Sequence, residues 1–287
     1  MRPKPVESQR SGSGTGRFRS AGERRRTAEL ANMVESSEGY VLQPAALQGP
    51  LTARNLEDFA LCPRKYLLSH FVPRGEARAF VGGPAALHRA VRAALMEAYA
   101  AGGPEAFGLA RLQAAFAQNW DGSCCRDSLE EERLQREGLR MLAQHLQSPV
   151  MGADLRADVR LEADLEGQAF VAVADVLGTD PPQVVRFSTS RRPPSPGELP
   201  EDLSWGLLWL LATEALGRQD VTGVLWDLRR ERRVEYTLDG PGRDELRRRL
   251  LAGARAIRSE RAFEPRKGQH CRWCRSRLQC PAWGRGR

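Results

Sequence analysis

The chain has 287 residues, of which 41% are hydrophobic and 28% charged, and its formal net charge is +8. This length supports one large hydrophobic core or two smaller ones, and no apolar run approaches the roughly 20 residues of a membrane span. The positive charge favours an anionic partner, of which nucleic acid is the commonest. Because nearly all of the 44 basic residues are arginines, a general arginine bias accounts for part of this excess.

The composition divides the chain into residues 1–45 and 46–287. The first part contains Ser-Gly-Ser-Gly-Thr-Gly, the run Arg24-Arg25-Arg26 and few large apolar residues, which predicts a disordered basic tail. A nucleic-acid-binding arm and an organellar transit peptide are alternatives for it, and Met33 is an alternative start. Residues 46–287 are expected to form one folded domain.

The first half of this domain has helical spacing. Leu56, Phe59 and Ala60 form one apolar face, and Pro63 suits the first turn of a new helix directly after Cys62. Further helices are predicted after Gly82-Gly83, around 104–119 and over 127–147.

The spacing of apolar residues changes to that of strands at residue 155. Apolar and charged residues alternate over 155–165, which predicts a strand with one buried face. Two more apolar strands are predicted at 170–176 and 183–189. After a proline-rich loop, the pattern predicts an apolar helix, two strands and an arginine-rich helix, at 202–217, 221–226, 233–238 and 241–260. This order indicates an α/β or α+β fold with a mixed central sheet flanked by helices.

Three cysteines lie close together near the end of the chain, in the C-x2-C-x5-C run Cys271, Cys274 and Cys280. Cys280 is followed by a proline, and so is the isolated Cys62 far upstream. Four thiolates with a Cys-Pro at the last ligand are typical of a 4Fe–4S cluster. A cluster on these residues would join the two ends of the domain, and closing so long a loop would stabilise the fold.

Zinc and disulfides are the alternatives for these cysteines. Zinc sites with four cysteines usually contain two short C-x2-C pairs, and this sequence has one. No hydrophobic signal segment opens the chain, which indicates a cytoplasmic location, where structural disulfides are rare. The remaining pair, Cys124-Cys125, has no partner motif and is expected to serve packing.

The order of these features resembles the PD-(D/E)XK nuclease superfamily, and within it the RecB-like and AddB-like exonucleases that carry an iron–sulfur cluster. The resemblance covers about 51–283 and is strongest at Cys62-Pro-Arg-Lys-Tyr66 and the three terminal cysteines. Gly83-Pro-Ala-Ala-Leu-His88 is similar to the family's Gly-x-x-x-His segment, whose histidine can bind the catalytic metal, although the glycine here is one residue farther away. Val173-Ala-Asp175 is similar to the strand that carries the family's first metal-binding aspartate.

The resemblance implies phosphodiester hydrolysis with magnesium or manganese held by carboxylates. The family's next strand typically reads Val-Val-Asp-Tyr-Lys-Thr, with the acid and the lysine on one face. In this chain Arg186 stands at the position of the acid and Ser188 at that of the lysine. A guanidinium there would repel a divalent metal and pair with Asp175. The catalytic site is therefore predicted to be degenerate, with Asp175 and His88 as a remnant metal half-site or as structural residues.

The family's Gln-x-x-x-Tyr signature is matched only in position, by Trp205 and Trp209, which are expected to lie in the core. Arginine runs such as Arg247-Arg248-Arg249 suit either a solvated face or a groove that follows phosphates.

We therefore expect an iron–sulfur protein with a nuclease fold that does not cleave DNA. It would bind DNA, as single strands or duplex ends, or support a helicase or repair subunit, in DNA repair, recombination or CRISPR-type processing. One alternative is an active exonuclease whose metal site is rebuilt from Asp175, His88 and another carboxylate such as Glu162. Another is a scaffold that binds only protein. A cytoplasmic protein, with association to the nucleoid as a further option and without membrane association, is expected in each case.

Overall fold

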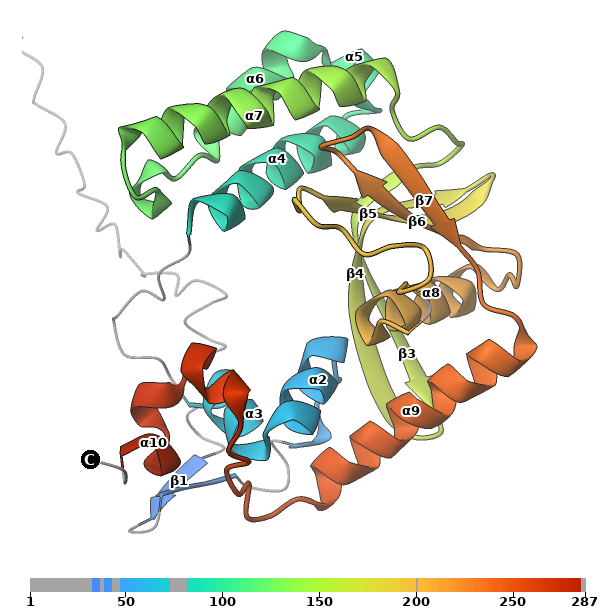
Figure 1. The fold of residues 1–287 in the computed structure, drawn as a ribbon. Coiled ribbons are helices and arrows are strands. Elements are labelled where there is room, and N and C mark those ends of the chain that lie inside the picture. Colours follow the sequence, from blue (N-terminus) through green and yellow to red (C-terminus); the bar gives the residue numbers. More distant parts are fainter. Residues whose placement is uncertain (1–32, 37–38, 43–46, 73–81, 200, 285–287) are drawn as a thin grey trace, which may run out of the picture.

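The computed structural model describes residues 33–36, 39–42, 47–72, 82–199 and 201–284. Its helices are α2 (Ala53–Leu61), α3 (Pro63–His70), α4 (Gly83–Ala100), α5 (Pro104–Phe107), α6 (Leu109–Gln118), α7 (Ser128–Gln147), α8 (Leu203–Leu216), α9 (Gly240–Ser259) and α10 (Pro281–Gly284). Its strands are β1 (Met33–Ser36), β2 (Gly39–Leu42), β3 (Arg156–Leu165), β4 (Gln168–Thr179), β5 (Pro182–Ser188), β6 (Thr222–Asp227) and β7 (Arg232–Tyr236). Figure 1 shows these elements on an arc, with α4–α7 at one end, the sheet in the middle, and α3 with α10 at the other end.

Five strands form one mixed sheet in the order β3-β4-β5-β6-β7. All neighbours are antiparallel except β5 and β6, which run parallel. Helix α8 lies between these two strands in the chain and provides the crossover that a parallel pair requires. The predicted mixed sheet with flanking helices is therefore confirmed. Among the described helices, none combines the length and apolar composition needed to cross a membrane.

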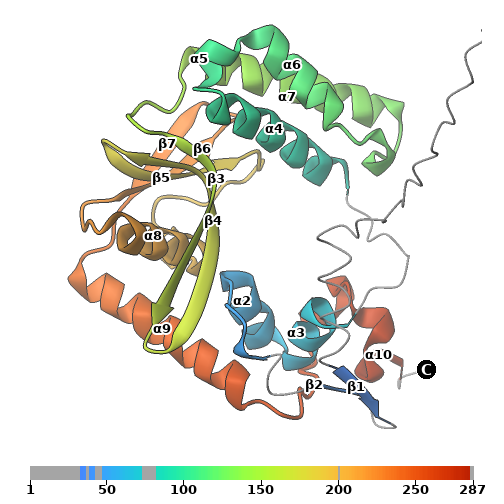
Figure 2. The ribbon, with the colours of Figure 1, turned by 180° about the vertical axis from the view of Figure 1, so that it is seen from behind.

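Helices cover both faces of the sheet (Figure 2). On one face, α4, α6 and α7 share a core with Val176 and Val185. On the other face, α8 and α9 share a core with Val184 and Leu225. Adjacent residues of β5 thus enter different cores, which explains why this inner strand is apolar on both sides.

Strand β4 changes faces near its middle. Ala174 belongs to the core under α8 and α9, whereas Val176 belongs to the core under α4 and α7, although alternate residues of a regular strand share a face. On the neighbouring strand, Asp158 has a φ of 51°, in the left-handed region that aspartate enters more readily than most residues. Asp158 and Asp175 therefore lie where the sheet bends from one core to the other.

Every helix and strand predicted from residue 46 onward is present with shifted ends, and Pro63 begins α3 as predicted. One difference is that 104–119 is split into α5 and α6 at Gly108, whose φ of 81° interrupts the helix. A second concerns the tail predicted to be disordered, in which β1 and β2 form a hairpin. The rest of that tail lies outside the described residues.

A buried carboxylate joins α2 to α3. Asp58 is 2% exposed, Lys65 Nζ lies 2.8 Å from its Oδ1, and His70 Nε2 lies 3.1 Å from its Oδ2. Burial opposes ionisation of Asp58, but the hydrogen bonds from His70 and Lys65 and the charge of Arg54 outweigh it. Together they lower the pKa of Asp58 to about 2.

We expect Asp58→Asn to lower the free energy of unfolding at pH 7 by roughly 2 kcal/mol, because each unit of lowered pKa stabilises the folded state by about 1.4 kcal/mol. The pKa is lower in the folded than in the unfolded chain, so this stabilisation is complete above about pH 4 and is lost as the pH falls toward 2. Urea unfolding between pH 7 and pH 2 measures it. The exposed Asp244 provides the control substitution Asp244→Asn. Wild type and Asp58→Asn losing stability equally on acidification would contradict the assignment.

Candidate functional site

The four cysteines predicted as a ligand set lie around one cavity. Cys62, between α2 and α3, lines a cavity of about 280 Å³ together with Cys271, Cys274 and Cys280 from the C-terminal segment. Figure 1 shows α3 and α10 close together at this end of the arc. The start and the end of the folded region therefore meet at this cavity.

Cys62 accepts a backbone hydrogen bond and lies among basic side chains. Cys62 ends α2 and precedes Pro63 of α3, which fixes its position between two helices. The backbone N–H of Arg266 donates to Cys62 Sγ at 3.3 Å. Basic side chains also line the cavity, namely Lys65, Arg266, Lys267 and Arg277. These groups offset the negative charge that a set of thiolates would bring.

The thiols are spread around the cavity and are not drawn together about one point. All six cysteines are free thiols. Within the part of the chain that the structure describes, no three His, Cys, Asp or Glu side chains are arranged as the ligands of one metal ion.

The second candidate site lies on β4, where Asp175 is 4% exposed. The Nε of Arg92, from α4, lies 2.5 Å from Asp175 Oδ1, and the backbone N–H of Phe187 donates to Asp175 Oδ2 at 2.6 Å. The pairing of β4 with β5 ends at Val176 and Val185. Beyond that pair, the side chain of Asp175 accepts the hydrogen bond that a main-chain carbonyl would otherwise accept from Phe187. Both oxygens of Asp175 are thus used to join β4, β5 and α4.

Arg92 is the cation that neutralises this carboxylate, so the predicted pair between Asp175 and Arg186 is wrong. Its Nη2 donates to Asp158 Oδ1 at 2.6 Å, and one guanidinium therefore bridges two aspartates on β3 and β4. Burial lowers the pKa of Arg92, but the two carboxylates outweigh burial and raise it above its ordinary value. The signal was in the sequence, because His88 and Arg92 are four residues apart and share a helix face.

Arg186 and Ser188 line one pocket, as their two-residue spacing predicts. Arg186 Nη1 donates to Ser204 Oγ at 2.8 Å, and its Cζ lies 5.0 Å from the centroid of the Trp205 ring. Among the described residues, no carboxylate forms an ion pair with Arg186. A guanidinium without an ion-pair partner among the described residues thus lies where the resemblance places the second metal-binding acid.

His88 lies in the same pocket and is uncharged at neutral pH. Its Nδ1 lies 3.3 Å from Thr189 Oγ1. Burial lowers the pKa of His88; the charge of Asp175 opposes this, and the charges of Arg92 and Arg186 add to it. A neutral imidazole can bind a metal, but these guanidinium groups disfavour a divalent cation beside it.

The remaining predicted residues lie outside this pocket or in the core. Glu162 is exposed on β3 and pairs with Arg160 at 2.8 Å, while Asp158 is the carboxylate that shares Arg92 with Asp175. Trp209 is fully buried and its Nε1 donates to the carbonyl of Val221 at 2.7 Å, as expected for a core residue.

Residues 50–281 match the PD-(D/E)XK nuclease superfamily. No curated protein matches the chain. A solved structure described as "Crystal structure of SSO0001" is 16% identical to this chain and covers 77% of it and 95% of its own chain, with a TM-score of 0.29. The superfamily match includes the cysteine segments and the strands that carry Asp175, Arg186 and Ser188. This chain therefore belongs to the PD-(D/E)XK nuclease superfamily.

Proposed function

We propose that this protein binds DNA at the position of the superfamily's active site without cleaving it. The observation that carries the proposal is the charge of that position. Both oxygens of Asp175 are engaged by Arg92 and Phe187, and Arg186 on the neighbouring strand forms no ion pair with a carboxylate of the described residues. A divalent metal would be repelled here, whereas a phosphate would be attracted.

The loss of catalysis follows from the same geometry. Hydrolysis in this superfamily depends on metal-bound carboxylates and on a cation that stabilises the developing charge. Here the lysine position is Ser188, whose hydroxyl accepts a hydrogen bond from the N–H of Ser190 at 3.2 Å. A serine supplies no positive charge to the attacked phosphate.

We also propose that Cys62, Cys271, Cys274 and Cys280 hold a 4Fe–4S cluster, as the resemblance to the RecB-like branch implies. Four thiols around one cavity of about 280 Å³ supply the donor set and room for a group larger than one ion. The N–H of Arg266 on Cys62 Sγ and the basic lining suit an anionic cluster. When bound, the cluster would act as a clip that joins α3 to the C-terminal segment and stabilises the fold.

Anaerobically purified protein is expected to be brown and to contain about four irons and four sulfides per chain. Cys274→Ser should lose the cluster and reduce the thermal stability, because one ligand and part of the clip are removed. Cys124→Ser is the matched control and should keep both. Colourless protein with one tightly bound zinc would contradict the cluster.

Binding of single-stranded DNA is expected to weaken steeply with salt and to depend little on base sequence, because the contacts are made to phosphates. Fluorescence anisotropy with labelled oligonucleotides from about 50 to 200 mM salt should give a slope of about −0.7 per phosphate contacted. Affinity that is absent at low salt, or that does not change with salt, would rule out this function.

We expect no cleavage of single-stranded or duplex DNA with magnesium or manganese. The expected rate is the same for wild type and Asp175→Asn, because Asp175 is already neutralised by Arg92. A gel assay with end-labelled DNA measures it. Metal-dependent cleavage by the wild type that disappears in Asp175→Asn would instead support an active exonuclease with a rebuilt site.

A further inference from the structure

The pocket beside β5 is unusually rich in positive charge. Its volume is about 570 Å³, within the range of about 300–1,000 Å³ that suits small ligands. Its charged lining consists of five arginines and one glutamate: Arg126, Arg133, Arg186, Arg191, Arg229 and Glu130. The lining also includes the hydroxyls of Ser188, Thr189 and Ser190 and the ring of Trp205. Such a lining suits a polar anion of nucleotide size.

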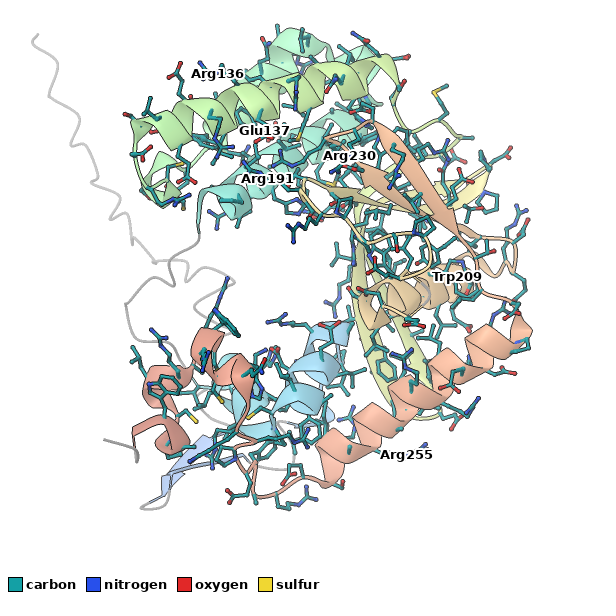
Figure 3. All side chains as sticks on the ribbon, viewed as in Figure 1. Arg136, Glu137, Arg191, Trp209, Arg230 and Arg255 are labelled. Carbon is teal, nitrogen blue, oxygen red and sulfur yellow. The ribbon has the colours of Figure 1, made fainter. Side chains whose placement is uncertain are left out.

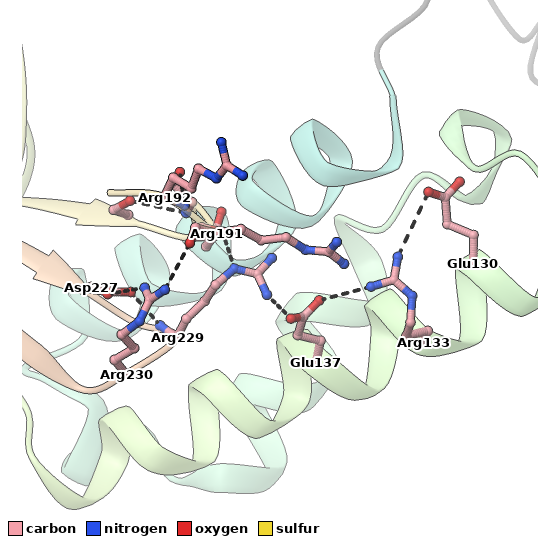
Figure 4. A network of polar contacts seen from close by, with 11 residues as sticks. Glu130, Arg133, Glu137, Arg191, Arg192, Asp227, Arg229 and Arg230 are labelled. Atoms are coloured by element: carbon pink, nitrogen blue, oxygen red, sulfur yellow. Dashed lines mark hydrogen bonds and ion pairs between the residues drawn. The ribbon is translucent and has the colours of Figure 1, made fainter. Parts of the chain in front are cut away.

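A chain of ion pairs holds part of this lining in place (Figure 4). The Nε of Arg229 donates to the carbonyl of Thr189 at 2.5 Å, and its guanidinium pairs with Glu137. Arg133 Nη1 lies 3.8 Å from the other oxygen of Glu137, and Glu130 Oε1 lies 3.2 Å from Arg126 Nη2. These three arginines share two glutamates, so one positive charge remains uncompensated.

Arg186 and Arg191 add two further charges. Among the described residues, neither guanidinium forms an ion pair with a carboxylate. The main-chain carbonyl of Arg191 accepts a hydrogen bond from Arg230 Nη2 at 2.9 Å, and Arg230 pairs with Asp227 at 2.7 Å. The backbone of this loop is therefore anchored while the Arg191 side chain extends into the pocket (Figure 4). Counted over the described residues, the five arginines of the lining and the two glutamates that pair with them leave an excess of three positive charges.

A phosphate monoester is the anion that best matches this charge. It carries close to two negative charges at neutral pH, whereas an internal phosphodiester carries one, and guanidinium groups bind phosphate oxygens through paired N–H donors. We infer that this pocket binds the terminal phosphate of a DNA strand, with arginines taking the place of catalytic metal ions. The inference rests on the proposed function, because it places the end of the bound DNA strand in this pocket.

The test compares single-stranded oligonucleotides that carry a phosphate or a hydroxyl at the 5′ or the 3′ end, in the presence of EDTA. A phosphate at one of the two ends should tighten binding about tenfold, the effect of one well-formed charged contact. Arg191→Gln should abolish this gain. Arg255→Gln, on the exposed face of α9 and far from Arg191 (Figure 3), removes the same charge and should leave the gain intact.

Three outcomes would overturn the inference. If DNA binds equally well with and without a terminal phosphate, the inference fails while the proposed DNA binding stands. If a deoxynucleoside monophosphate binds as tightly as the phosphorylated strand, the pocket serves free nucleotides. If no DNA binds at low salt, the proposed function fails together with the inference. Arg186→Gln, checked for folding by thermal unfolding, provides a second variant that should lose the gain.

Discussion

The structure depends on one guanidinium group, that of Arg92, which bridges Asp158 and Asp175 at 2.6 and 2.5 Å. Asp175 is buried, and two neighbouring carboxylates would repel each other without a cation between them. Arg92 of α4 supplies this cation, and the same contact fixes α4 to the sheet where β4 passes from one core to the other.

This contact also bears on the pocket next to it. With Asp158 and Asp175 neutralised by Arg92, the charge of the pocket beside β5 is set by its arginines together with Glu130 and Glu137. This charge is the basis of the proposed binding of phosphate, and the hydrophobic frame of β5 is retained, with Val184, Val185 and Phe187 buried. At the other end of the arc, the four cysteines surround a separate cavity, so the proposed clip and the proposed DNA-binding pocket have no lining residue in common.

Local sequence patterns were sufficient for most of the fold. Apolar spacing located the helices and strands, and the prolines after Cys62 and Cys280 singled out cysteines that do meet around one cavity. Local patterns did not predict the ion-pair partner of Asp175. Arg186 lies opposite Asp175 on the neighbouring strand, and this position favoured it as the partner. Its side chain turns instead toward Ser204 and Trp205. The bend of β4 turns Asp175 toward α4, and the spacing of apolar residues in the sequence does not indicate this bend.

The most direct test of this view is calorimetric titration of manganese into the wild-type protein, with Arg92→Ala and Asp175→Asn for comparison. If Arg92 occupies the place of a metal, the wild type should bind no manganese at Asp158 and Asp175. In Arg92→Ala the carboxylates of Asp158 and Asp175 lose their cation, so they should bind manganese through their negative charge. Stoichiometric binding of manganese by the wild type that weakens in Asp175→Asn would contradict the central claim.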